Sequence, residues 1–173
     1  MPRFENEAAC SIVAFKDGVF SRAGHDVKLE AGTVIVDVED GKVVVIIDAR
    51  SIRPVCAMKD GREDRAALSV KDLDTIRGYV DNDILAVARH PEIRYESSTL
   101  TRQGNALAVD GKLTLRGRTR PLRARVERKN DRWVTRVTIR QPEFGIRPFT
   151  ALLGGLKIKP DVMVELSIPA IDL

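Results

Sequence analysis

The sequence is poor in the residues that most often supply catalysis, metal binding or disulfide bonds. Its 173 residues include two cysteines, two histidines and one tryptophan, and aromatic residues make up 5% of the chain. The cysteines, Cys10 and Cys56, predict two free thiols rather than a disulfide framework. Zinc sites need closely spaced Cys or His pairs, and only His25 and His90 could join these thiols. We therefore expect no metal site.

Long hydrophobic runs are also missing. No apolar run approaches the roughly 20 residues that cross a membrane as a helix, and the first residues lack the basic start and longer apolar region of a secretory signal. We therefore expect a cytoplasmic protein without a transmembrane segment. The composition, 43% hydrophobic and 31% charged with a formal net charge of +4, is typical of a single globular domain over residues 1–173.

The sequence does contain many runs in which apolar and polar residues alternate. Successive side chains of a strand point to opposite faces, so this period of two predicts strands with one covered face. Turn signals such as Asp40-Gly41, Gly104-Asn105 and Asn130-Asp131 separate neighbouring runs. The runs are residues 8–15, 27–39, 42–52, 93–99, a run containing Leu113 and Leu115, and residues 121–128, 132–140 and 156–168. They predict an all-β protein of about eight antiparallel strands, arranged as a sandwich or barrel.

The middle of the chain, residues 54–91, has a different period. Apolar residues between positions 69 and 80 have helical spacing. Ser69 is the expected N-cap, with Asp72 three positions later as in a capping box. A second short helix is expected over residues 83–90. The sequence therefore predicts a helical insert whose apolar face packs on the sheet or across the mouth of a barrel.

Arginines recur at even spacing along the predicted strands after residue 115. They are Arg116, Arg118, Arg120, Arg123, Arg125, Arg132, Arg136 and Arg140. Such a stripe could bind phosphates, or it could be a solvated face whose charges meet acidic residues on neighbouring strands. We favour the solvated face and expect no nucleic-acid partner, because no aromatic residues are interleaved for base stacking.

The two histidines have both catalytic and structural interpretations. His25 beside Asp26 could be a poised base, but no nucleophile motif accompanies it, and we favour a histidine that fixes its loop by hydrogen bonds to the backbone. His90 is expected to cap the C-terminus of the helix at 83–90.

The apolar alternation of the strands also has two interpretations. It fits either a packed core or a wide barrel with a lipid-sized cavity.

Several segments, in order along the chain, resemble the YceI-like family. The pieces are Ser21–Asp26, Asp48–Ile52, His90–Ile93 with Tyr95 and Ser97, Gly111–Gly117 with Thr119 and Pro121, and Phe144–Ile146. The resemblance implies an eight-stranded, antiparallel, lipocalin-like barrel with helices near one end. It also implies a long apolar cavity for a prenyl chain, such as that of a polyprenyl phosphate or a quinone.

We therefore expect a non-enzymatic carrier or sequestering protein whose partner is a hydrophobic small molecule or lipid. No cofactor is expected apart from a bound isoprenoid or quinone, and a homodimer is left open. The expected cavity wall comprises Val45, Ile47, Ile93, Tyr95, Leu113, Leu115, Leu122, Val126, Trp133, Val137, Ile139, Val164 and Leu166, with Phe144 and Phe149 closing one end. Arg22, His25 and Arg50 are the expected head-group residues. The alternatives are an enzyme that uses His25 on a hydrophobic substrate and an interaction module with a filled barrel.

Overall fold

The computed structural model describes residues 2–17, 25–148, 150 and 157–172. Its strands are β1 (Arg3–Phe4), β2 (Ala9–Lys16), β3 (Asp26–Ala31), β4 (Val34–Glu39), β5 (Lys42–Asp48), β6 (Ile52–Lys59), β7 (Arg62–Asp64), β8 (Glu92–Gln103), β9 (Ala106–Leu115), β10 (Arg118–Lys129), β11 (Arg132–Arg140) and β12 (Ile158–Pro169). The helical elements are η1 (Ala49–Ser51), α1 (Val70–Tyr79), η2 (Val80–Ile84) and η3 (Gln141–Phe144). The prediction of an all-β fold with a helical insert is confirmed.

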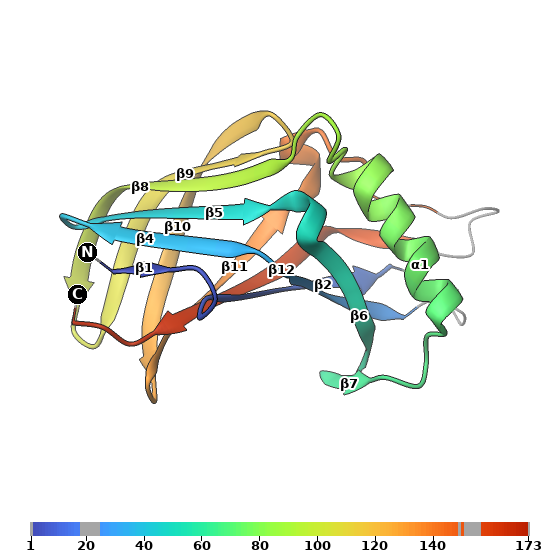
Figure 1. Ribbon diagram of the computed structural model, residues 1–173, viewed down its shortest axis with the longest axis horizontal. Coiled ribbons are helices and arrows are strands. Elements are labelled where there is room, and N and C mark those ends of the chain that lie inside the picture. Colours follow the sequence, from blue (N-terminus) through green and yellow to red (C-terminus); the bar gives the residue numbers. More distant parts are fainter. Residues whose placement is uncertain (1, 18–24, 149, 151–156, 173) are drawn as a thin grey trace.

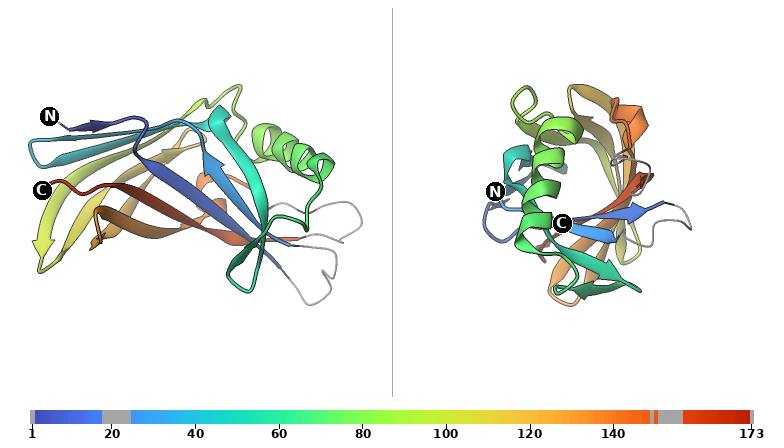
Figure 2. Two further views of the ribbon diagram at one scale, coloured as in Figure 1. Left: turned by 60° about the horizontal axis from the view of Figure 1, so that its bottom comes forward. Right: turned by 90° about the vertical axis from the view of Figure 1, so that its right-hand side faces the viewer.

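The strands form one antiparallel sheet in the order β1-β4-β5-β8-β9-β10-β11-β12-β2-β3-β6-β7. The sheet curls into a barrel-like shape, with α1 at one end and both chain termini toward the other (Figures 1 and 2). We call these the helix end and the terminal end. β3 pairs with both β2 and β6, and β4 pairs with β5. Because β3 leads directly into β4, the circuit of strands closes through this segment of chain.

The described part of the chain has twelve strands rather than the eight expected, mainly because two long strands are bent. The run predicted over 27–39 divides into β3 and β4, and the run that starts at residue 42 continues past η1 as β6. The two bends lie side by side. The Gly32 N–H donates to the Ser51 carbonyl at 3.0 Å, and the Asp48 N–H donates to the Thr33 carbonyl at 3.1 Å. The two- and three-residue strands β1 and β7, which the sequence analysis missed, account for the remainder.

A single hydroxyl group stabilises this double bend. Ser51 Oγ accepts the backbone N–H of Thr33 at 2.9 Å and lies 2.6 Å from the Asp48 carbonyl, to which it donates. The Asp48 carboxylate accepts the Arg50 N–H as the N-cap of η1. These hydrogen bonds therefore pair backbone groups that the bend removes from the strand ladders.

The helical insert begins as predicted but ends differently. Ser69 and Asp72 form a complete capping box at the start of α1, which confirms the predicted N-terminus. The second helix predicted over 83–90 is wrong. α1 instead continues into the π-helical turn η2, and Ala86 has a positive φ of 50°, a backbone conformation that interrupts a right-handed helix. His90 therefore caps no helix, and its ring lies against Gly117.

Buried apolar side chains form two clusters inside the barrel. The helix-end cluster consists of Val27, Leu29, Ala49, Ile52, Val80, Leu85, Leu113, Leu115, Ile139, Phe144 and Ile146. The terminal-end cluster consists of Phe4, Cys10, Val34, Val36, Val38, Val45, Leu107, Val109, Trp133 and Ile168. Together they frame the interior from both ends.

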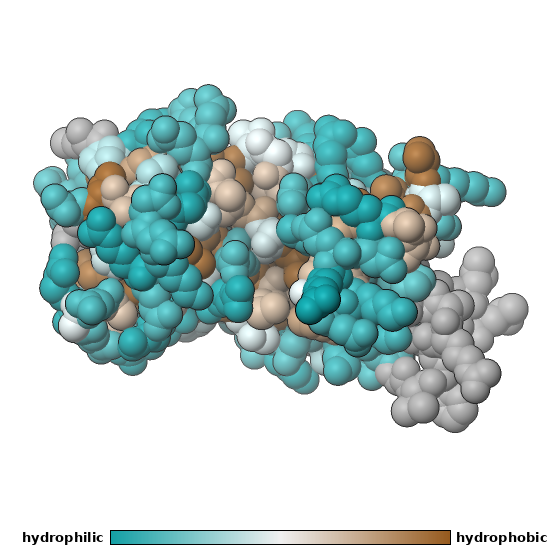
Figure 3. Space-filling model, turned by 90° about the horizontal axis from the view of Figure 1, so that it is seen from below, coloured by the Kyte–Doolittle hydropathy of each residue, from teal (hydrophilic) through white to brown (hydrophobic). Residues whose placement is uncertain are grey.

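The outer surface is predominantly polar. The face shown in Figure 3 is mostly hydrophilic, with smaller hydrophobic patches between the polar side chains. Several arginines of the predicted stripe form ion pairs through exposed side chains: Arg123 with Asp110, Arg125 with Glu127, Arg136 with Glu165 and Arg140 with Asp161. These pairs are the arrangement expected of a solvated face. Among the described residues, no helix is both long and apolar enough to cross a membrane.

Candidate functional site: an apolar cavity inside the barrel

The interior of the barrel contains a cavity of about 320 Å³. This volume lies at the lower end of the range of about 300–1,000 Å³ typical of small-molecule sites. A filled core would bury inward-facing residues such as Val162 and Val164, yet both are only partly buried. Val162 packs against the helix-end cluster, and Val164 packs against both clusters. The side chains of opposite walls therefore leave room between them.

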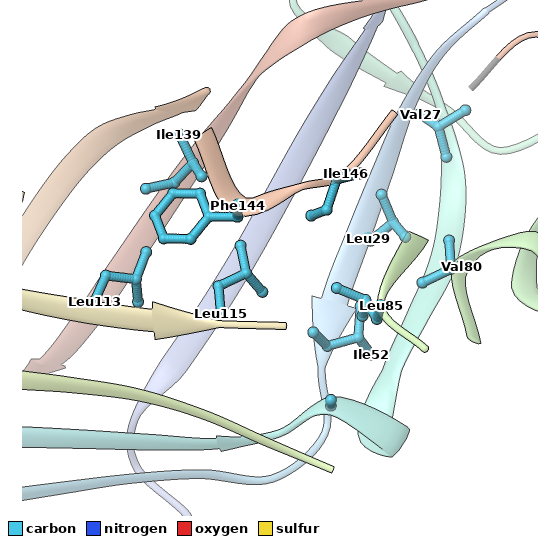
Figure 4. Close-up of a cluster of buried hydrophobic side chains, with 11 residues drawn as sticks. Val27, Leu29, Ile52, Val80, Leu85, Leu113, Leu115, Ile139, Phe144 and Ile146 are labelled. Atoms are coloured by element: carbon cyan, nitrogen blue, oxygen red, sulfur yellow. The ribbon is translucent and has the colours of Figure 1, made fainter. Parts of the chain in front are cut away.

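Inward-facing side chains of most long strands line this cavity. All of the predicted wall residues lie around it except Phe144 and Phe149. Phe144 is buried in the helix-end cluster beside Ile139 (Figure 4), and Phe149 lies outside the described residues. Contact of any of these side chains with a ligand stays a prediction.

The structure adds wall residues that the sequence analysis missed. β2 contributes Cys10, Ile12 and Ala14, and their spacing of two was a usable signal. Leu100 has the opposite parity to Tyr95 because the β8 register shifts between Ser97 and Thr99, and such a bulge reverses the inward-facing set. The helical insert contributes Ile76, Tyr79, Val80, Ile84 and Leu85. Gln141, which directly follows β11, also lines the cavity.

Tyr95 is fitted closely to the strand beside it. Its hydroxyl lies 3.2 Å from the Leu122 carbonyl and 3.4 Å from the Val109 carbonyl. The ring lies over Gly111, where an added Cβ would overlap both the Tyr95 ring and the Glu96 carbonyl oxygen. Gly111 is therefore required by this close approach of a ring to the backbone.

The wall is uncharged. Among the described residues that line the cavity, none is acidic, basic or a histidine. Burial raises the pKa of the Cys10 thiol to about 12. Burial, assisted by the charge of Asp110, raises the pKa of the Tyr95 hydroxyl to about 12. Both groups are therefore neutral at physiological pH, and the Cys10 thiol is a poor nucleophile.

Segments outside the regular strands pack at the helix end of the cavity. Figure 4 shows Leu85 from the turn after η2 beside Ile52, and Phe144 from η3 beside Ile139. The Arg116 guanidinium donates to the carbonyls of Asp83 and Ile84 at 3.0 and 3.1 Å. This arginine is therefore not part of the solvated stripe, because it ties the end of η2 to the turn between β9 and β10.

The two predicted head-group residues that the structure describes, Arg50 and His25, do not line the cavity. Arg50 lies on η1 with an exposed side chain. His25 precedes β3 and is not part of the wall, and its neighbour Asp26 accepts the Lys16 N–H. Arg22 lies outside the described residues. The structure therefore brings neither Arg50 nor His25 to the place where a buried ligand would sit.

Four of the family-like segments come close together at the helix end: Asp48–Ile52, His90–Ile93, Gly111–Gly117 and Phe144–Ile146. The bend at Asp48–Ile52 is tied to the start of β8 by the Ala49 N–H, which donates to the Pro91 carbonyl at 2.9 Å. The His90 ring lies against Gly117, and Gly145 lies against the Arg118 guanidinium. These segments, far apart in the sequence, therefore build the junctions that close the barrel around the cavity.

Solved structures share this architecture. One is BcnA from Burkholderia cenocepacia, with 15% identity, a TM-score of 0.60 and coverage of 95% of this chain and 96% of that one. Another, from Saccharophagus degradans, is described as a polyisoprenoid binding domain implicated in plant cell wall breakdown; it has 13% identity, a TM-score of 0.61 and coverage of 98% and 97%. A Campylobacter jejuni YCEI protein has 12% identity, a TM-score of 0.56 and coverage of 84% of both chains.

At these identities the structural likeness shows the fold. A search of curated protein sequences found no match. At the level of sequence, the family model of the YceI-like domain matches residues 9–170. The chain therefore belongs to the YceI-like family.

Proposed function

We propose that this protein binds an isoprenoid lipid with the prenyl chain inside the barrel and acts as a carrier or sequestering protein. The observation that supports this most directly is the cavity of about 320 Å³ with an uncharged, almost entirely apolar wall. Each CH₂ group that leaves water for such a site contributes about 0.8 kcal/mol. A prenyl chain could therefore bind through its length alone.

The polyisoprenoid binding domain of Saccharophagus degradans, which shares the fold, supports the same ligand class. The chemistry of the wall favours binding over catalysis. His25 lies outside the wall, and burial keeps the Cys10 thiol protonated by raising its pKa to about 12. General acid–base and nucleophilic catalysis both need a group that can exchange a proton near neutral pH. A cytoplasmic location stays a prediction.

Gentle purification followed by native mass spectrometry tests the proposal. We expect protein that carries a species of lipid mass, and we expect the emptied protein to take up a fluorescent prenyl probe. Trp133, the single tryptophan, lines the cavity, so its fluorescence should report the occupant directly. Empty protein that also fails to take up the probe would contradict the proposal.

A variant that fills the cavity tests whether the probe binds there. Ala124 lines the cavity, so Ala124→Phe should lower probe affinity by about tenfold or more, because the ring occupies the space of the ligand. Ala66 is exposed and away from this wall, and Ala66→Phe is the matched control with unchanged uptake. Equal affinities of the two variants, with both folded, would place the binding site elsewhere.

A further inference from the structure

One polar side chain interrupts the apolar interior. Among the described residues, Gln141 is the one polar or charged residue that is fully buried, with 4% of its surface exposed. It also lines the cavity. Burying an amide costs free energy unless its groups are hydrogen-bonded, so a glutamine at this position needs a reason.

The surrounding structure holds Gln141 in place. Its side-chain Nε2 donates to the Lys159 carbonyl at 3.1 Å. Its backbone carbonyl accepts the Ile146 N–H at 3.1 Å, and Pro142 follows it in the first turn of η3. Gln141 is therefore a fixed polar group at the helix end of the cavity.

Part of the amide has no partner within the described chain. No donor to the Gln141 Oε1 is present among the described residues, and Nε2 uses one of its two N–H groups on Lys159. Gln141 lines the cavity, so its remaining oxygen and N–H can bond to an uncharged oxygen group of a ligand there, such as a hydroxyl.

The same wall disfavours an anion. A phosphate loses its hydration on entering a dry site, and this loss is offset only by a cation or by several donors. None of the described lining residues is charged, and the Arg50 side chain points to the exposed surface. A neutral head group loses much less hydration.

We propose that Gln141 binds an uncharged, oxygen-bearing head group inside the barrel, so that the protein selects prenyl alcohols over prenyl phosphates. This inference rests on the proposed function, since it concerns the head group of the same ligand. It replaces the expectation of a head group bound by arginine.

Three probes with the same prenyl chain test the selection: farnesol, the hydrocarbon farnesene and farnesyl phosphate, each titrated against Trp133 fluorescence. The wild-type protein should bind farnesol about five- to tenfold more tightly than farnesene, as one neutral hydrogen bond allows. Farnesyl phosphate should bind more weakly than farnesol. Gln141→Met, close in size and without hydrogen-bonding groups, should bring the affinities for farnesol and farnesene together.

Gln103 is exposed at the end of β8, and Gln103→Met is the matched control that should keep the preference for farnesol. If no probe binds the wild-type protein, the proposed function itself fails. If farnesol and farnesene bind the wild-type protein equally, or farnesyl phosphate binds best, the function stands and the role of Gln141 is wrong. The wild-type comparison decides this even if Gln141→Met is unfolded.

Discussion

The two ends of the barrel bury apolar side chains by different means. At the terminal end, strands supply every residue of the cluster, and the largest ring is anchored by the Trp133 indole N–H, which donates to the Ile171 carbonyl at 2.9 Å. At the helix end, Ala49, Val80, Leu85, Phe144 and Ile146 come from turns and helical segments.

This difference has a physical consequence. Ladder hydrogen bonds between strands hold each inward-facing residue at the terminal end, so the strands must separate before a residue there can move. At the helix end, α1 has no buried residue and begins with a capping box, and the η2 turn after it is held by two hydrogen bonds from Arg116. Segments with few buried contacts open at lower free energy. We therefore expect ligand entry at the helix end, and matched pairs of variants can test this comparison.

The largest difference should come from the buried leucines. Leu107 is 1% exposed in the terminal-end cluster, and Leu85 is 8% exposed after η2. Leu107→Ala should lower the free energy of unfolding by about 3–5 kcal/mol, because the strands around it cannot collapse into the space. Leu85→Ala should cost about 2 kcal/mol, because its segment can shift. Urea denaturation measures both, and an equal or larger loss for Leu85→Ala would reverse the comparison.

Substitution by alanine should change the stability of the protein in opposite directions at two glycines. At Gly111 a Cβ would overlap the Glu96 carbonyl and the Tyr95 ring, whereas at Gly78 in α1 a Cβ meets nothing within 4 Å. Gly111→Ala should destabilise the protein by about 1–3 kcal/mol through overpacking. Gly78→Ala should stabilise it by up to about 1 kcal/mol, as expected inside a helix. The midpoints of thermal unfolding of the two variants measure both effects. A Gly111→Ala variant as stable as the wild type would contradict the close contact between Gly111 and the Tyr95 ring.

Two arginines differ in what they hold. Arg116 binds the carbonyls of Asp83 and Ile84, whereas Arg136 pairs with Glu165 on the exposed face. Arg116→Met should cost about 1–2 kcal/mol because the Asp83 carbonyl and the partly buried Ile84 carbonyl lose a charged donor.

Arg136→Met should cost less than about 1 kcal/mol, as is usual for an exposed ion pair. If the helix end admits the ligand, Arg116→Met should also accelerate release of a fluorescent prenyl probe in stopped-flow measurements, and Arg136→Met should not. Unchanged release from a folded Arg116→Met variant would argue against entry beside η2.

The smallest effect concerns the N-cap of α1. Hydrogen bonds from the Ser69 hydroxyl and the Ser69 backbone N–H lower the pKa of the Asp72 carboxyl. Because the pKa of Asp72 is lowered in the folded state, its carboxylate contributes to folding stability. This contribution is complete above the unfolded pKa of about 3.9 and is lost as the pH falls through the lowered pKa.

Ser69→Ala should lower stability by about 1 kcal/mol at neutral pH and reduce the loss on acidification. Ser69→Thr retains a hydroxyl and should resemble the wild-type protein. Unfolding midpoints measured across this range test both statements, and identical acid profiles for Ser69→Ala and the wild type would show that the capping box contributes nothing.

Much of this protein was determined by its sequence alone. The strand alternation, the Asp40-Gly41, Gly104-Asn105 and Asn130-Asp131 turns and the Ser69 cap all depend on local geometry, so a period or a residue type predicts them. For the same reason, the predicted wall side chains on the strands do lie around the interior.

Only the tertiary structure decided the features that depend on distant partners. The double bend exists because the hydroxyl of Ser51 and the backbone at Thr33 meet across two strands, and the shift in β8 reverses parity in a way that no period reveals. Burial of Gln141 and exposure of Arg50 likewise follow from where the bend and η3 place them. Alternation in the sequence predicts which side chains face inward. The width of the cavity and the polarity of its wall are set by the curl of the whole sheet.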